Sequence, residues 1–159
     1  MRRPPQRKYY VTRGVGNKVV SETMTKEQLE AIEGSQFELI LCMVTARMVV
    51  TSSSGKRIEY FRQWPRMGRV SLQLIEAILL NSGEYLTPAD LAEITGNDNL
   101  RENSNVAARI MAIRRTLHDD NETYVQTRKT PKHYAVRWSG KPFIWIERAP
   151  NDLADTQDD

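Results

Sequence analysis

The sequence predicts an α+β fold of the winged helix-turn-helix type: an N-terminal antiparallel sheet, a core of three helices and a C-terminal β-hairpin wing. Three observations carry this prediction. Short β-rich segments fill residues 37–63, helical patterns with clear starts and stops follow in 71–118, and a cationic hairpin comes next at 123–138. In that arrangement the third helix enters the DNA major groove and the hairpin reaches the backbone or an adjacent groove.

Composition limits the class of protein. The chain has 159 residues, of which 40% are apolar and 27% charged, and this suits one globular domain with a real core. The only cysteine, Cys42, lies in an apolar run, so no internal disulfide can form and a core position is the simplest interpretation. We find neither an apolar run of about 18 residues nor a secretory signal, and we expect a cytoplasmic protein without membrane contact.

Charge is unevenly distributed, although the formal net charge is only +3. The sequence begins with a basic arm and ends with acidic residues. We therefore divide the chain into an extension at 1–36, a domain at 37–148 and an acidic tail at 149–159 that we expect to be disordered. The arm, residues 1–8, either touches phosphates or the minor groove, or is only a solubilising tail.

The extension contains a predicted hairpin over residues 9–22. Gly16 and Asn17 at its tip are residue types that tolerate positive φ. Thr25 and Gln28 then fit a capping box, and a short helix should run to about residue 33. This piece is too small for a core of its own, so it must pack on the domain at 37–148 or on another copy of the chain.

Residues 37–63 are predicted to form two or three strands. An apolar run at 37–44 and a β-rich segment at 46–51 lead through a turn into an alternating segment at 56–63. Pro65 ends the last of these because proline lacks a backbone N–H.

Two helices precede the basic one. The first runs from Ser71 to about Asn81, and Gly83 is its stop signal. The second has a strong start, with Thr87 as N-cap and Pro88 at the first helical position, and it ends at Gly96.

The basic helix, residues 104–118, is the element that the rest of the chain is expected to present. Its apolar residues recur at i, i+4, i+7 and i+11 and form one narrow stripe: Val106, Ile110, Ile113 and Leu117. Asn103 or Ser104 can cap its start. The opposite face mixes small and long side chains, Ser104, Ala108, Met111, Ala112 and Arg115, with Arg109 and Arg114 on its flanks. Arginines on such a face suit the major groove, which offers guanine O6 and N7 as acceptors. The alternative is an ordinary amphipathic helix with a solvated basic face.

The predicted wing is the hairpin at 123–138, with its tip at 127–134. Three cations at the tip, Arg128, Lys129 and Lys132, can contact phosphates without first ordering a loop, because a strand pair holds them. The alternative is a solvated turn. Residues 142–147 form one further strand beyond the wing.

Over about residues 37–138 the ordered series of motifs resembles the OmpR/PhoB-type winged-helix effector domains of bacterial response regulators. The segment GEYLTPADL at 83–91 is similar to the family's entry into its second helix. The remaining matches are Gly96 at the end of that helix, Val106, Ile110, Ile113, Arg114, Arg115 and Leu117 in the recognition helix, and Thr127 and Tyr134 in the wing.

The resemblance implies sequence-specific binding of double-stranded DNA and control of transcription. It implies base or phosphate contacts at Arg109, Ala112, Arg114 and Arg115, and a wing contact at Lys129. The chain departs from the family in three ways. We expect no receiver domain, so phosphorylation of an aspartate is not implied. The wing has Pro131 and His133 where the family has glycines, and the chain continues past the wing.

We predict a stand-alone bacterial or phage transcription regulator that binds duplex DNA as a homodimer or tandem assembly. Its assembly surface is expected to be either the N-terminal hairpin and helix or the strand at 142–147. The predicted DNA-binding residues are Asn105, Arg109, Met111, Ala112, Arg114, Arg115, Arg128, Lys129, Lys132 and His133.

The alternative function is a protein-interaction module of the same fold that binds RNA polymerase, a replication factor or another regulator. We expect no enzyme, no cofactor and no metal. Two histidines and one cysteine supply no structural zinc set, and the chain has no phosphate-binding glycine loop.

Overall fold

The structure, a computed structural model, describes residues 7–52, 54–62, 64–130 and 133–149. The strands are β1 (Lys8–Val15), β2 (Lys18–Thr25), β3 (Leu39–Cys42), β4 (Arg47–Thr51), β5 (Arg57–Phe61), β6 (Val125–Lys129), β7 (Tyr134–Trp138) and β8 (Phe143–Arg148). The α-helices are α1 (Lys26–Glu30), α2 (Arg69–Leu80), α3 (Pro88–Thr95) and α4 (Asn103–Leu117). Two 3-10 helices, η1 (Gly34–Gln36) and η2 (Asp98–Arg101), complete the elements.

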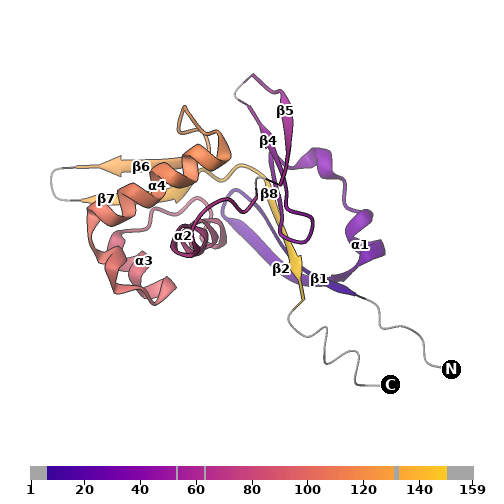
Figure 1. Cartoon of the computed structure of the whole chain (residues 1–159), viewed down its shortest axis with the longest axis horizontal. Coiled ribbons are helices and arrows are strands. Elements are labelled where there is room, and N and C mark those ends of the chain that lie inside the picture. Colours follow the sequence, from indigo (N-terminus) through magenta and orange to yellow (C-terminus); the bar gives the residue numbers. More distant parts are fainter. Residues whose placement is uncertain (1–6, 53, 63, 131–132, 150–159) are drawn as a thin grey trace.

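A six-stranded mixed sheet is the centre of the fold. Its strand order is β2-β1-β8-β3-β4-β5, and every neighbouring pair is antiparallel except β3 and β8, which run parallel. Helices α2, α3 and α4 and the two-stranded hairpin β6–β7 lie on one side of this sheet, and α1 lies on the other (Figure 1).

The last strand, β8, contributes apolar side chains to a hydrophobic core on each face of the sheet. Phe143 and Trp145 belong to the large core that the sheet shares with α2, α3 and α4. The alternating residues Ile144 and Ile146 belong to a smaller core on the opposite face, together with Val11. Because successive side chains of a strand point to opposite faces, a strand covered on both sides reads as a continuous apolar run.

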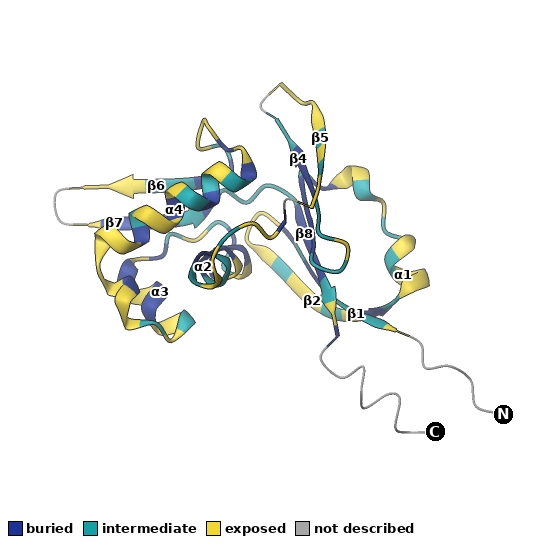
Figure 2. Cartoon of the chain, viewed as in Figure 1, coloured by how far each residue is buried: buried dark blue, intermediate teal, exposed yellow. Residues whose placement is uncertain are grey.

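The large core fixes the helices and the hairpin to the sheet. Trp138 of β7 stacks on Tyr124, and the Trp138 indole meets the ring of Phe143 edge-on. A β-bridge between Leu86 and Val136 ties the segment before α3 to the hairpin. All four residues of β3 are buried, and Figure 2 shows further buried residues in β4 and β8 and on the inner sides of the helices.

The prediction of a winged helix-turn-helix, with an N-terminal antiparallel sheet and a three-helix core, is wrong. The N-terminal hairpin and the strand at 142–147 were predicted to be additions to that core. Instead β8 inserts between β1 and β3 and joins all of these segments into one mixed sheet, which dominates the fold. The physical reason is the apolar character of β8, which can be buried on both faces only inside a sheet.

The central place of β8 also corrects one predicted assembly surface. Both edges of β8 are already paired, with β1 and with β3. Its backbone therefore has no free edge to offer a second chain. The N-terminal hairpin, in contrast, supplies the edge strand β2.

Local signals predicted the helix starts better than they predicted the fold. The capping box of Thr25 and Gln28 is confirmed, although α1 is shorter than predicted. Thr87 caps α3 and Gly96 ends it in the left-handed conformation, both as predicted. The predicted cap of α4 is wrong: Asn103 is already helical, and the N-cap is Glu102, without a side-chain hydrogen bond.

Candidate nucleic-acid interface

The helix α4 lies with its apolar stripe in the core and its basic face outward. All four stripe residues are buried: Val106, Ile110, Ile113 and Leu117. The opposite face, including Ala108, Met111 and Arg115, is exposed, as the periodicity predicts. The side chain of Met111 is 61% exposed, so nothing in the described chain covers the middle of this face.

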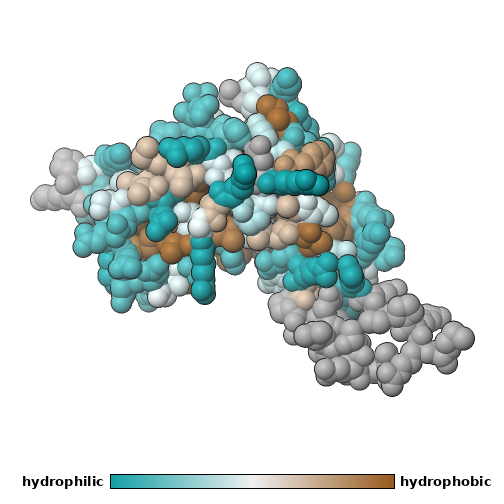
Figure 3. Space-filling view, viewed as in Figure 1, coloured by the Kyte–Doolittle hydropathy of each residue, from teal (hydrophilic) through white to brown (hydrophobic). Residues whose placement is uncertain are grey.

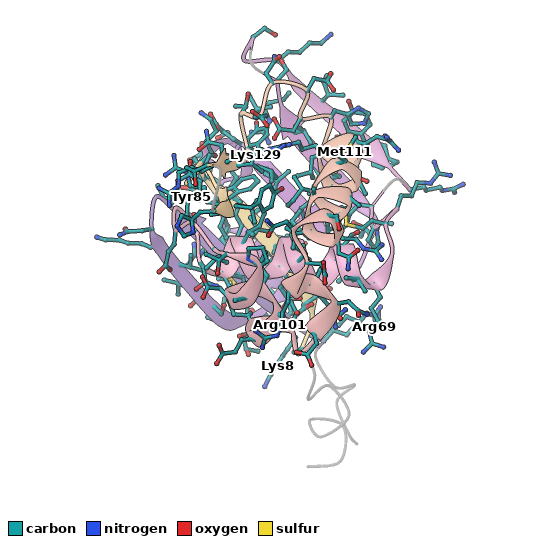
Figure 4. All side chains as sticks on the ribbon, turned by 90° about the vertical axis from the view of Figure 1, so that its left-hand side faces the viewer. Lys8, Arg69, Tyr85, Arg101, Met111 and Lys129 are labelled. Carbon is teal, nitrogen blue, oxygen red and sulfur yellow. The ribbon has the colours of Figure 1, made fainter. Side chains whose placement is uncertain are left out.

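Arg109 and Arg115 are the exposed cations of α4. Arg109 lies on the flank toward Gly68, just before the start of α2. Figure 4 looks onto α4, with the labelled Lys129 and Tyr85 on one side of the helix and Arg69 on the other. In the view of Figure 3 the surface is mostly hydrophilic, with smaller hydrophobic patches. This face therefore combines the exposed side of a helix with cations on both of its flanks.

Two other predicted DNA-binding residues of α4, Asn105 and Ala112, are less available to a ligand. The side-chain amide of Asn105 donates a hydrogen bond of 2.8 Å to the carbonyl of Asn99, so it holds the start of α4 to η2. Ala112 is half-buried, and it offers a ligand only its methyl group. Direct reading of bases by α4 would therefore depend mainly on its two exposed arginines, Arg109 and Arg115, and on Met111.

The hairpin β6–β7 carries a second basic cluster, of which the sequence predicted only a part. The guanidinium carbons of Arg128 and Arg137 lie 4.4 and 4.5 Å from the ring centroid of Tyr85. Arg137 also donates from Nε to Oε1 of Gln126, at 2.9 Å. Cations stacked on an aromatic ring are held in place while their N–H groups stay available. We call Tyr85, Arg128 and Arg137 the arginine–tyrosine stack.

Tyr85 and Arg137 were missed because neither lies at the hairpin tip. The strand register pairs Gln126 with Arg137 and Arg128 with Ala135, so these side chains share one face of the hairpin. The alternation that places Arg137 on the same face as Arg128 can be inferred from the sequence. The position of Tyr85 beside these arginines cannot, because it depends on the bridge between Leu86 and Val136 of β7.

The remaining predicted hairpin residues lie near the tip. Lys129 is exposed, and its ammonium lies 6.0 Å from the ring centroid of Tyr134. His133 is exposed and closes the tip through backbone hydrogen bonds with Thr130. Lys132 lies outside the described residues.

Arg114 has partners within the protein. It donates from Nε and Nη2 to the carbonyl of Val125, at 3.1 and 2.9 Å, and forms a 2.8 Å ion pair with Glu122. Its side chain is only 19% exposed. The structure therefore gives Arg114 the role of joining α4 to β6, which fixes the hairpin beside the helix.

The connection from α4 to β6 is held by a buried carboxylate. Asp119 accepts hydrogen bonds from three consecutive backbone N–H groups, those of Thr123, Tyr124 and Val125, at 2.8 to 3.1 Å. It is 4% exposed. A groove of about 510 Å³ runs past this connection, between Met111 and Arg115 of α4 and the loop after Asp119.

His118 connects the end of α4 to the sheet. It ends α4 in the left-handed conformation, and its ring stacks on Tyr60 of β5, with centroids 4.3 Å apart. Beside it lies a cleft of about 260 Å³, also lined by Tyr124. Burial raises the pKa of Tyr124 to about 12, and its hydroxyl donates to the carbonyl of Thr51.

The ion pairs of the described chain leave the cations of this face without carboxylate partners, as they do several cations elsewhere on the surface, among them Lys56 and Arg69. Six ion pairs link carboxylates to other cations of the described chain, among them Arg13, Arg47 and Arg114. None of these pairs involves the exposed cations Arg109, Arg115, Arg128 and Lys129 or the half-buried Arg137. Among the described residues these cations lack carboxylate partners, and no three side chains of the metal-ligating types gather into a site.

The comparisons with known proteins give no family. No protein-family model matches the chain, and no curated protein or solved structure is significantly similar to it. The resemblance to OmpR/PhoB-type domains therefore stays a prediction. Within the described residues no helix has both the length and the apolar character needed to cross a bilayer.

Proposed function

We propose that this chain binds double-stranded DNA and regulates transcription in the cytoplasm, with α4 in the major groove and the hairpin β6–β7 on the phosphate backbone. One observation supports it above the others: the outer face of α4 and the adjacent hairpin expose four cations, Arg109, Arg115, Arg128 and Lys129, that lack carboxylate partners within the described chain. A surface that leaves arginines unneutralised is suited to a polyanion.

The exposed face of α4 suits a groove. Ala108 and Ala112 are small, so the helix backbone can approach another surface closely. Arg115 extends from the middle of that face and Arg109 from its flank, and both can reach base edges or phosphates. Met111 lies one turn before Arg115 and offers an apolar contact of the kind that thymine methyl groups accept.

The hairpin suits the backbone better than it suits the bases. The arginine–tyrosine stack presents two guanidinium groups, each able to bind a phosphate oxygen pair in bidentate fashion. Lys129 adds a third cation beyond them. Contacts of this kind position a protein on the duplex and carry little sequence information.

Arg114 is a positioning residue in this proposal. Because it bonds the carbonyl of Val125 from within α4, it sets the distance between the helix and the hairpin. Its charge is largely compensated by Glu122. We therefore reassign Arg114 from DNA contact to support of the hairpin.

The helix and hairpin roles can be separated by two single variants. Arg115→Ala should weaken binding to a duplex selected for tight binding about tenfold more than binding to a random duplex, since a base contact contributes about 1–3 kcal/mol of discrimination. Lys129→Ala should weaken binding to the two duplexes equally. It should also make the slope of log affinity against log salt concentration shallower by about 0.9, the contribution of one phosphate. Lys26→Ala is the control for the loss of a lysine elsewhere, because Lys26 is exposed on α1, across the sheet, where it pairs with Glu30. Equal losses on both duplexes for Arg115→Ala would reject its role in base reading.

One observation favours a second candidate. The exposure of Met111 beside Ala108 is also what a protein-binding helix face would show, since methionine adapts to irregular apolar partners. RNA polymerase, a replication factor or another regulator is the class of partner. Duplex binding that falls with salt separates the two, because only the DNA interface requires phosphate neutralisation.

A further inference from the structure

The strand β2 is a long, open edge of the central sheet. It has eight residues and pairs with β1 on one side, and no strand of the described chain pairs with it on the other. Val20 on this strand is 55% exposed, and Val15 across the turn is 59% exposed. Edges of this length with exposed apolar side chains are templates for pairing with another strand.

The turn between β1 and β2 determines which backbone groups face outward. It consists of Gly16 and Asn17, with Gly16 at a φ of +62°, as in a two-residue hairpin with glycine at its first central position. In such a hairpin the flanking pair, Val15 and Lys18, exchange hydrogen bonds, and bonded pairs alternate from there. The N–H and C=O groups of Val19, Ser21 and Thr23 therefore point to the open edge.

These outward groups allow only some antiparallel registers between two copies of β2. Residues whose N–H and C=O groups point outward, which all have odd numbers on β2, must face one another across the two strands. Residues with even numbers then also face one another. Centring the pair on Glu22 brings two glutamates together, and centring it on Ser21 sets Val20 against Glu22. Centring it on Val20 sets Val20 opposite Val20 and Lys18 opposite Glu22, and only this register matches apolar with apolar and cation with anion.

We propose that the chain forms a two-fold homodimer by antiparallel pairing of β2 with the β2 strand of a second copy, with the axis at Val20. The contact extends onto a groove of about 320 Å³ lined by Val15, Val20 and Phe37. Glu22 already holds Arg13 at 2.5 Å within its own chain. Lys18 of the partner subunit approaches that carboxylate from the open side and completes a charge network. The inference does not depend on DNA binding.

The test uses the full chain with one added cysteine. In this register the two Val20 side chains face each other in a pair without mutual hydrogen bonds, where the Cα atoms are about 4.5 Å apart, so Val20→Cys can form a disulfide across the axis. Thr23→Cys is the matched control, because Thr23 is also exposed on β2 but lies away from the axis. Cys42 is buried, and the unsubstituted chain controls for it.

We expect Val20→Cys to give a disulfide-linked dimer about tenfold faster than Thr23→Cys under the same oxidant, because pairing holds the two thiols together. Light scattering after gel filtration should give a dimer mass for the unsubstituted chain, and Lys18→Glu should shift it toward monomer, since two glutamates would then face each other. A monomer mass at all concentrations would overturn the proposal. Faster cross-linking of Thr23→Cys in a dimer would overturn the register.

Discussion

Replacing Arg128 and Arg137 together by glutamine is expected to weaken binding to a random DNA duplex roughly a hundredfold, because two charged hydrogen bonds to phosphate contribute about 3 kcal/mol. The slope of log affinity against log salt concentration should also become shallower by about 1.8, since each neutralised phosphate contributes about 0.9. Fluorescence anisotropy at several salt concentrations measures both quantities.

A matched control removes the same charge elsewhere. Lys26→Gln combined with Lys56→Gln takes away two exposed cations, one on α1 and one in the turn after β4. If the net charge alone determined affinity, this pair would match the loss in the arginine variant. A salt slope that stays unchanged in the arginine variant contradicts the assignment of the arginine–tyrosine stack to phosphate.

Tyr85→Leu tests what the ring contributes. Both arginines keep their charge in this variant but lose the surface on which they stack. We therefore expect a smaller loss of affinity than in the double arginine variant, with the salt slope nearly preserved.

Asp119→Ala is expected to lower the free energy of unfolding by about 3 kcal/mol, because three backbone N–H groups lose a charged acceptor in a buried place. Urea unfolding followed by circular dichroism gives the value. Asp120→Ala is the matched control: Asp120 is adjacent in sequence but exposed, so its substitution should change stability by less than about 0.5 kcal/mol. Equal stability of the two variants would show that Asp119 does not hold the connection from α4 to β6.

The sequence predicted the local elements well, because their causes are local. The stripe from Val106 to Leu117 fixed which face of α4 is buried, and the capping box at Thr87 fixed where α3 begins. The hairpin at residues 125–138 followed from alternation and a turn-forming tip. Such signals depend on neighbours within a few residues, and one sequence contains them.

The sheet was not predictable in the same way. The apolar run at 143–146 indicates a strand buried on both faces, but it does not say which strands flank it. Its parallel pairing with β3 joins segments about a hundred residues apart, and no local pattern specifies that partner. The winged helix-turn-helix prediction is wrong for this reason: β8 lies inside the central sheet and is not an addition to a complete domain.

The candidate interface was predictable in part. The exposed arginines of α4 and the cations near the hairpin tip followed from periodicity and charge. The partners of Arg114, Asn105 and Tyr85 did not, since each contact joins different elements. In the structure the predicted DNA-contacting residues Asn105 and Arg114 hold other elements of the chain in place. Tyr85 and Arg137, which were not predicted, belong to the candidate interface.

The most direct test of the central claim is a titration of the unsubstituted chain against random-sequence duplex DNA, by fluorescence anisotropy, over a range of salt concentrations. With three hairpin cations and two helix arginines on the DNA, the slope of log affinity against log salt should be about −4 to −5, since each phosphate contributes about 0.9. No binding even at about 50 mM salt, where phosphate contacts are strong, would contradict the proposal that α4 and the hairpin form a DNA interface.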